Sequence, residues 1–138
     1  MSDWADRVRT ARDHRHVGTP RACELAGVTF RQSDHWVRIG LLEPAVRGKG
    51  SGRYHQWTRD DVALLHVLGT LARLGERMHP TVAATVAREL SRLPLDWWPE
   101  VMTVAPDGAL VPDDNDETVT VTLRPKVCAR YVAEGWAS

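Results

Sequence analysis

The sequence predicts an α+β fold that is mainly α-helical. Along most of the chain, apolar residues recur at intervals of three and four, which is the period of a helix that buries one face. Two regions depart from this period and are typical of short strands: a glycine-rich stretch over residues 44–57 and a stretch over residues 101–123 that ends in alternating Val119, Val121 and Leu123. A chain of 138 residues can bury one good core, or one small domain with an appendage.

The charges are unevenly distributed, although the chain is formally neutral. Residues 1–75 hold 12 Lys and Arg against 8 Asp and Glu, whereas residues 76–138 hold 6 against 10. A basic first half suits phosphates, and an acidic second half suits a different partner. The sequence has no apolar run of about 18 residues and no apolar signal segment at its charged N-terminus, so we expect a cytoplasmic protein without a membrane span. Cys23 and Cys128 are expected to be buried free thiols.

The start of the chain predicts an N-terminal helix or arm, which we delimit as residues 1–18. A helix over residues 2–14 would place Trp4, Val8 and Ala11 on one face and surround that face with arginines. This helix either docks on the rest of the protein or contacts phosphates. The last five residues of the segment are expected to be a linker.

Two short helices around a tight turn follow this linker. Thr19 is expected to cap the first helix, with Pro20 at its first position. Gly27 supplies the turn, because glycine readily adopts a positive φ. Thr29 caps the second helix, and Gln32 three residues later completes a capping-box pattern.

The second of these helices, residues 29–39, is predicted to have two different faces. The face toward the core consists of Phe30, Ser33, Trp36 and Val37. The opposite, polar face consists of Arg31, Asp34, His35 and Arg38. A basic, polar face on a helix that follows a tight turn suits the reading of base edges in the DNA major groove, and an ordinary solvated face is the alternative.

A loop rich in glycine and cations comes next. Residues 47–53 contain three glycines and the cations Arg47, Lys49 and Arg53, with no acidic residue. Glycines allow such a loop to approach a nucleic-acid backbone closely, and the cations can bind its phosphates. Together with the two helices, this loop predicts a winged helix-turn-helix DNA-binding domain over residues 19–77.

The remaining sequence predicts two further helices and a small mixed tail. Thr58 caps a third helix that buries a stripe including Val62, Leu65 and Leu68 and stops at Gly75, and His66 within it is expected to be a partly buried structural residue. Residues 80–93 predict a fourth helix, which is too short for a long dimer seam and is favoured to pack on the winged domain. A β-β-β-α tail follows, with strands at 101–104, 109–111 and 118–123 and a helix from Pro125. We assign the region 78–138 to dimerisation or to the binding of a protein partner.

Several short motifs are similar to those of a known family. The residues that carry this likeness are Thr29-Phe30-Arg31, Trp36, Arg38-Ile39-Gly40-Leu41-Leu42, Pro44, Gly52, Tyr54, Trp57-Thr58 and Asp60-Asp61. In order and spacing they resemble the recognition helix and wing of MerR-type regulators, including the MerR-like proteins of actinobacteria and their phages. The likeness extends over about residues 19–75.

The resemblance implies roles for individual residues. Arg31 corresponds to an arginine that contacts bases or phosphates, and Arg38 to an arginine near the end of the recognition helix. Tyr54 corresponds to a wing tyrosine. His35 stands where the family usually has a tyrosine that contacts the DNA backbone, and His55 where a wing arginine often touches phosphate. A neutral histidine contributes less electrostatic attraction at both positions.

The sequence therefore predicts a sequence-specific transcriptional regulator that binds double-stranded DNA, as a homodimer. The residues expected to contact DNA are Thr29, Arg31, Gln32, His35, Arg38, Arg47, Lys49, Arg53, Tyr54 and His55. No cofactor, metal ion or group of catalytic residues is predicted, so we do not expect an enzyme. Two alternatives remain: an excisionase-like architectural DNA-binding protein, and a protein-interaction adaptor that uses the C-terminal half.

Overall fold

The fold is α+β and mainly helical, as predicted. The structure is a computed structural model, and it describes residues 16–48, 55–74, 80–111 and 121–136. In chain order the elements are β1 (Val17–Gly18), α2 (Thr19–Ala26), α3 (Phe30–Arg38), β2 (Gln56–Trp57), α4 (Arg59–Ala72), α5 (Pro80–Ser91), the 3-10 helix η3 (Leu95–Trp97), β3 (Met102–Val104), β4 (Val121–Leu123) and α6 (Pro125–Trp136).

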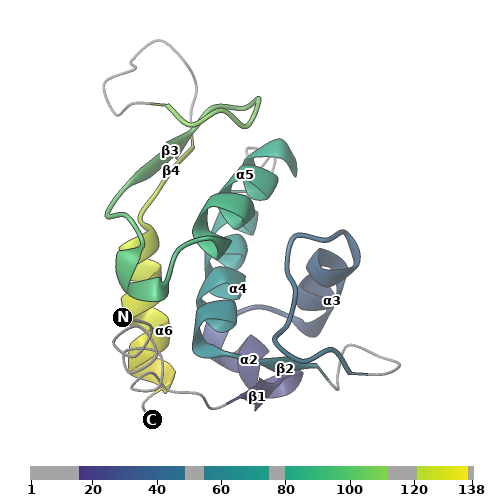
Figure 1. The fold of residues 1–138 in the computed structure, drawn as a ribbon. Coiled ribbons are helices and arrows are strands. Elements are labelled where there is room, and N and C mark those ends of the chain that lie inside the picture. The colour runs from purple at the N-terminus through teal and green to yellow at the C-terminus, as the bar shows by residue number, and fades with distance from the viewer. Residues whose placement is uncertain (1–15, 49–54, 75–79, 112–120, 137–138) are drawn as a thin grey trace, which may run out of the picture.

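Helix α4 lies at the centre of the molecule and packs against α2, α5 and α6 (Figure 1). Thr58 caps it as predicted, since its hydroxyl accepts the Asp61 N–H at 3.2 Å. The predicted stripe Val62, Leu65 and Leu68 is fully buried. Apolar residues outside that stripe, such as Val67, are buried too, because neighbouring helices cover α4 on several sides.

The first small sheet joins the two ends of the helix pair. Strand β1 runs antiparallel to β2, with Val17 opposite Trp57. On the other side of β2, Val46 and Gln56 exchange two backbone hydrogen bonds, of 3.1 and 2.8 Å. The prediction that residues 17 and 18 belong to a linker was therefore wrong, because pairing with a strand 38 positions away makes them extended.

Thr19 has a different role from the predicted one. Helix α2 has Gly18 at its N-cap position and no side-chain cap, so Thr19 already lies inside the helix. Its buried hydroxyl instead accepts the indole N–H of Trp57 at 3.0 Å. Because a buried polar indole needs a partner, this bond anchors the start of α2 to the first sheet.

The C-terminal elements cover the other sides of α4. Helix α5 buries Val82, Val86 and Leu90 against the core, so it packs on the rest of the fold as favoured by the sequence. It ends at Ser91, two residues before the predicted end. Strand β3 pairs antiparallel with β4. The predicted strand 109–111 contributes a bridge between Leu110 and Val104 on the other side of β3.

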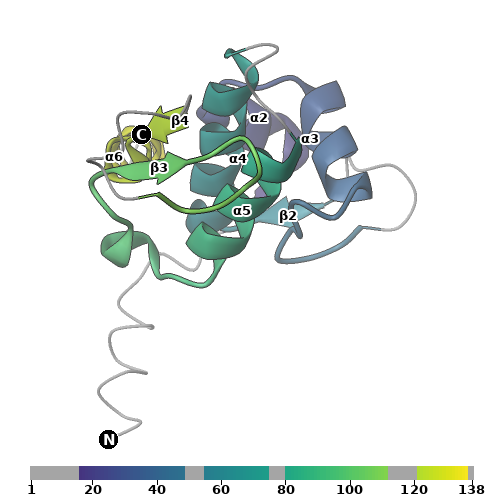
Figure 2. The same cartoon turned by 90° about the horizontal axis from the view of Figure 1, so that it is seen from above.

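One continuous cluster of buried residues joins the two halves of the chain. It includes Ala22 and Leu25 of α2, and Val132 and Trp136 of α6. Seen from above, α3 and α6 lie on opposite sides of α4 (Figure 2). The fold therefore presents two separate helical faces to its surroundings.

Some predictions concern residues outside the described ranges, and others concern a membrane span or a metal site. The third helix ends at Ala72, before the predicted stop at Gly75. The helix 2–14 and the acidic loop 113–117 lie outside the described residues. In the part of the chain that the structure describes, no helix combines the length and apolar character needed to cross a membrane. That same part contains no group of three or more His, Cys, Asp or Glu side chains placed to hold a metal ion.

Candidate nucleic-acid interface

The turn between α2 and α3 is fixed by hydrogen bonds and by close packing. Gly27 has a φ of 73°, in the left-handed region that favours glycine, and its N–H donates to the Cys23 carbonyl at 2.9 Å. Val28 follows and packs against the core. It touches α4 where Gly69 lies, and a Cβ built on Gly69 would stand 2.5 Å from Val28 Cγ1. Because glycine has no side chain at position 69, the turn between α2 and α3 can pack directly on α4.

The N-terminus of α3 has the predicted capping box. Thr29 Oγ1 accepts the Gln32 N–H at 3.1 Å, and Gln32 Oε1 accepts the Thr29 N–H at 3.0 Å. One acceptor of each side chain is thus used inside the protein. The Thr29 hydroxyl hydrogen and the Gln32 amide group remain donors that suit phosphate oxygens.

The inner face of α3 is anchored by Ser33, Trp36 and Val37, which are all buried as predicted. Ser33 donates to the Phe30 carbonyl at 2.8 Å, and the Cys23 thiol lies 3.5 Å from the Ser33 hydroxyl as donor to it. Burial raises the pKa of the Cys23 thiol, so it stays protonated and serves packing. The expectation of buried free thiols is confirmed for both cysteines.

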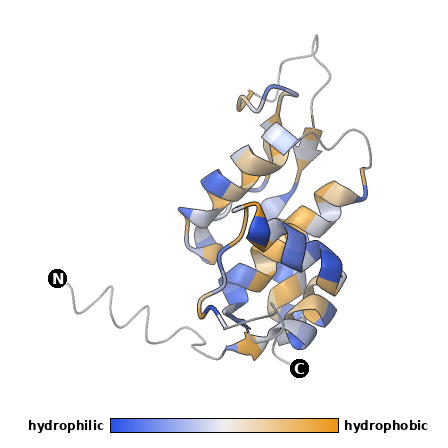
Figure 3. Ribbon diagram, turned by 90° about the vertical axis from the view of Figure 1, so that its right-hand side faces the viewer, coloured by the Kyte–Doolittle hydropathy of each residue, from blue (hydrophilic) through white to orange (hydrophobic). Residues whose placement is uncertain are grey.

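The outer face of α3 carries the predicted polar residues. Arg31 and His35 are exposed. Arg38 is exposed too, and its guanidinium lies 2.9 Å from the Asp34 carboxylate. Figure 3 views the molecule from the side of α3, where hydrophilic residues colour much of the ribbon. Because the inner face is fixed, these side chains project from a rigid support.

Phe30 departs from the prediction, because it is 41% exposed instead of facing the core. It is the first residue of α3. Ile39 at the other end of α3 is also exposed. Sequence reasoning missed the exposure of Phe30, and its position at the very start of the helix is the signal that was available. An exposed phenyl ring there can contact a thymine methyl group.

At the base of the predicted wing, the side chain of His55 is hydrogen-bonded to the backbone of Gly48. Its Nδ1 accepts the Gly48 N–H at 2.9 Å, and the side chain is only 8% exposed. Burial lowers the His55 pKa below its usual value, and the positive charge of Arg47 lowers it further. His55 is therefore a neutral acceptor that has a structural role inside the protein, and its predicted contact with DNA stays a prediction. Arg47 beside it is exposed, as a phosphate contact requires.

The Asp61 carboxylate, which the sequence analysis names only as part of the family resemblance, connects this region to α4. Asp61 Oδ2 accepts the Ala45 N–H at 3.1 Å and the Thr58 N–H at 3.0 Å. Burial raises the Asp61 pKa, while these hydrogen bonds oppose that shift. The segment that leads into the predicted wing is thus tied to the start of α4. The other predicted wing contacts, Lys49, Arg53 and Tyr54, lie outside the described residues.

Behind the helix pair, His66 links three helices. Its Nδ1 lies 2.7 Å from the Ala26 carbonyl at the end of α2, and its ring stacks on Tyr131 of α6. Burial lowers the His66 pKa, although the hydrogen bond to Ala26 opposes this. The predicted structural role of His66 is confirmed. Its position fixes the end of α2 relative to α4 and α6.

Part of the chain is similar in sequence to proteins that are named as transcriptional regulators. No protein-family model matches the chain. Uncharacterized HTH-type transcriptional regulators of Mycobacterium bovis and Mycobacterium tuberculosis are 36% identical to it over 61 residues. The matched stretch is 44% of this chain and 27% of each of those proteins, so the chain corresponds to a minor part of the relatives' length.

Proposed function

We propose that this chain is a MerR-like, winged helix-turn-helix regulator of transcription that binds double-stranded DNA. Helix α3 would enter the major groove, and the loop after Val46 would hold the backbone. The observation that carries the proposal is the outer face of α3, which exposes Arg31, His35 and Arg38 while Ser33 and Trp36 fix the helix from behind.

The hydrogen-bonding chemistry of this face supports the proposal. An arginine can donate two hydrogen bonds to guanine O6 and N7, and Arg31 lies in the first turn of α3, the part of a recognition helix that approaches base edges. The Asp34 carboxylate holds Arg38 in one direction, which reduces the ordering that a contact would require. The names of the mycobacterial relatives support the same function.

The test begins with selection of bound sequences from a random pool of double-stranded DNA. Binding of the selected site is then compared, by fluorescence anisotropy at fixed salt, between the wild type, Arg31→Ala and Arg92→Ala. Arg92 lies just after α5 and is similarly exposed, so it controls for the loss of one positive charge. We expect Arg31→Ala to lose about 1–3 kcal/mol of binding free energy and to relax the preference at one base position. Equal affinities of the two variants would overturn the assignment of α3, and the absence of any selected sequence would overturn the proposed function.

A further inference from the structure

The two adjacent tryptophans after α5 have opposite environments. Trp98 is buried, and its indole N–H donates to the Leu93 carbonyl at 3.3 Å. Trp97 is 73% exposed, the largest exposed fraction among the large apolar side chains that the structure describes. The core therefore accounts for Trp98 and leaves Trp97 in solvent. An exposed tryptophan suits a contact with another molecule, because its large ring gives much apolar area with few rotatable bonds.

A small hollow adjoins the chain on both sides of Trp97. The 3-10 helix η3 packs against α6 (Figure 1). Leu95 and Asp96, the two residues before Trp97, line the hollow. Two residues after Trp97, the Pro99 carbonyl accepts the Lys126 N–H at 3.1 Å, and Lys126 also lines the hollow. Trp97 thus lies in a segment that is held against the start of α6.

The hollow has the size of a site for one side chain. Its volume is about 170 Å³, whereas sites for small molecules usually measure about 300–1,000 Å³. Its apolar lining consists of Leu95, Ala129 and Ala133. A small apolar hollow beside an exposed tryptophan suits a peptide that inserts a single apolar side chain.

Two arginines that line the hollow have no ionic partner. Arg59, the first residue of α4, is half-buried, and Arg130 of α6 is exposed. Neither guanidinium forms an ion pair or a hydrogen bond with any residue that the structure describes. The third cation, Lys126, is different, because its Nζ lies 3.6 Å from the Glu100 carboxylate. A free guanidinium can donate two parallel hydrogen bonds to a carboxylate, so the two arginines suit acidic residues.

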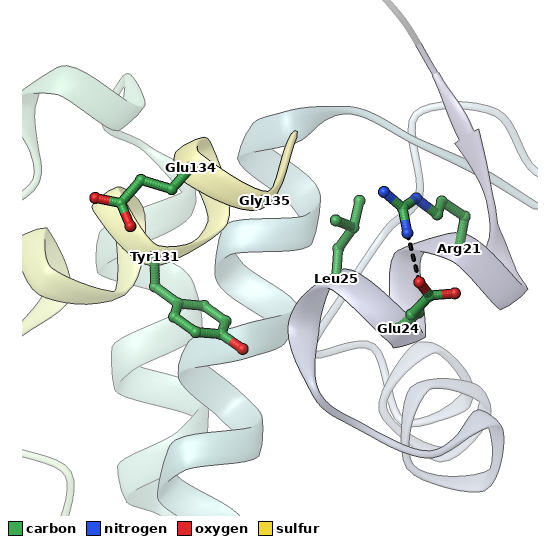
Figure 4. A pocket seen from close by; sticks show the side chains of 6 residues that line it. All are labelled: Arg21, Glu24, Leu25, Tyr131, Glu134 and Gly135. Atoms are coloured by element: carbon green, nitrogen blue, oxygen red, sulfur yellow. Dashed lines mark hydrogen bonds and ion pairs between the residues drawn. The ribbon is translucent and has the colours of Figure 1, made fainter. Parts of the chain in front are cut away.

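The hollow between α2 and α6 offers a contrast (Figure 4). It too has an arginine in its lining, Arg21, but this guanidinium is already paired with the Glu24 carboxylate. An acidic ligand there would have to displace Glu24. Of these two hollows, the one beside η3 is therefore the better match for an acidic ligand.

We infer that a partner protein binds this chain through an acidic segment at the Trp97 surface, which consists of Trp97, Arg59, Arg130 and the hollow between η3 and α6. One apolar side chain of the segment fills the hollow, and its carboxylates bind Arg59 and Arg130. The segment also covers Trp97. Opposite charges on the two sides give the contact its specificity, and the apolar side chain and Trp97 give most of its affinity.

The backbone of DNA fits this surface less well. A duplex has no apolar side chain for the hollow, and its closely spaced phosphates would also lie near Asp96 and Glu100. A peptide can place its acidic residues at the two arginines alone. Helix α6 lies on the opposite side of α4 from α3, so DNA bound at α3 would leave the Trp97 surface accessible (Figure 2).

The test selects peptides from a displayed library of random sequences of about 12 residues. The library is depleted on an Arg59→Ala/Arg130→Ala double variant and then selected on the full wild-type chain. We expect the enriched peptides to contain an apolar residue flanked by Asp or Glu. Fluorescence anisotropy of a labelled enriched peptide should give a dissociation constant of about 10–100 µM, since the contact is small. Arg59→Ala, Arg130→Ala and Trp97→Ala should each raise this constant about tenfold.

Two control variants separate the proposed contact from general effects. Arg21→Ala removes one positive charge at the hollow of Figure 4 and should bind the peptide like the wild type. Trp97→Phe keeps an aromatic ring and should retain most of the affinity that Trp97→Ala loses. Thermal unfolding midpoints equal to that of the wild type show that each variant is folded. Trp97 and Arg130 are exposed, so we expect their variants to meet this condition.

Three outcomes would overturn the inference. The first is that no peptide is enriched on the wild type over the double variant. The second is that the enriched peptides lack acidic residues or bind the alanine variants as well as the wild type. The third is that a duplex of about 20 base pairs displaces the labelled peptide and loses affinity with Arg59→Ala and Arg130→Ala, which would make the Trp97 surface a nucleic-acid contact. Because the peptide measurements contain no DNA, their outcome is independent of the proposed function.

Discussion

Helices α3 and α6 both turn a face to the surroundings, and the two faces differ in kind. On α3, polar and basic residues occupy the middle, and the apolar Phe30 and Ile39 stand at the ends. On α6, by contrast, the apolar Val127 and Tyr131 are exposed. Helices α3 and α6 lie on opposite sides of α4 (Figures 1 and 2).

The difference shows what each face suits. A polar centre can exchange water for the hydrogen-bonding edges of bases and for phosphates, so affinity there depends on salt. An apolar centre suits contact with another apolar surface, because such contact removes both surfaces from water. If this distinction holds, changes on one face should leave the other face intact, except where both depend on the same core.

The largest effect is expected where both faces share their support. Leu65 in the middle of α4 is fully buried. Leu65→Ala should lower the free energy of unfolding by about 2–5 kcal/mol through lost burial and a cavity. DNA affinity should then be lost at a lower urea concentration than in the wild type, in parallel with unfolding. Leu110→Ala, at an exposed apolar residue, should change the stability by no more than about 0.5 kcal/mol. A change at Leu65 as small as that at Leu110 would contradict the central role of α4.

The second effect should separate the two faces. A Cβ at position 69 would clash with Val28, so Gly69→Ala should push the turn between α2 and α3 away from α4. We expect a loss of about 1–3 kcal/mol in unfolding free energy, which exceeds the gain of about 1 kcal/mol from helix propensity. DNA affinity should fall, because the turn positions α3. Adding Val28→Ala should relieve the clash and recover part of the stability. A higher unfolding free energy for Gly69→Ala than for the wild type would contradict this prediction, because it would mean that the turn between α2 and α3 moves away from α4 without a measurable cost.

The third prediction concerns contact between Phe30 of α3 and the methyl group of a single thymine. If Phe30 contacts a thymine, replacing that thymine by uracil in the selected site should weaken binding of the wild type about fourfold, the equivalent of about 0.8 kcal/mol for one buried methyl group. The same replacement should not affect Phe30→Ala. Scanning each thymine of the site by anisotropy measures this. If no thymine shows a loss that depends on Phe30, its exposure has another purpose.

Sequence patterns predicted the features of this interface that depend on neighbouring residues. The Thr29–Gln32 capping box and the turn at Gly27 involve contacts within a few positions, and both are present in the structure. The errors involve residues whose surroundings come from distant segments. Thr19 is not a cap because Trp57, 38 positions later, uses its hydroxyl.

Helical periodicity has the same limit at the ends of helices. It placed Phe30 on the face of α3 toward the core, but periodicity does not say whether another element covers the first turn, and Phe30 is 41% exposed. His55 is an analogous case, since its burial depends on contacts such as that between its Nδ1 and the Gly48 N–H.

The smallest effect tests whether His55 belongs to the wing base and not to the DNA contact. Its pKa in the folded protein lies below the ordinary histidine value of 6.5, so the stability that it contributes is present above pH 6.5 and is lost as the pH falls through the lowered pKa. Protonation places a hydrogen on Nδ1, which then no longer accepts the Gly48 N–H. The Gly48 amide signal in ¹H–¹⁵N spectra should therefore titrate below pH 6.5. His55→Asn keeps an acceptor oxygen without a titrating group and should remove this titration, whereas His35→Asn on the exposed face of α3 should not. A Gly48 signal that titrates in His55→Asn as it does in the wild type would mean that another group sets the environment of the wing base.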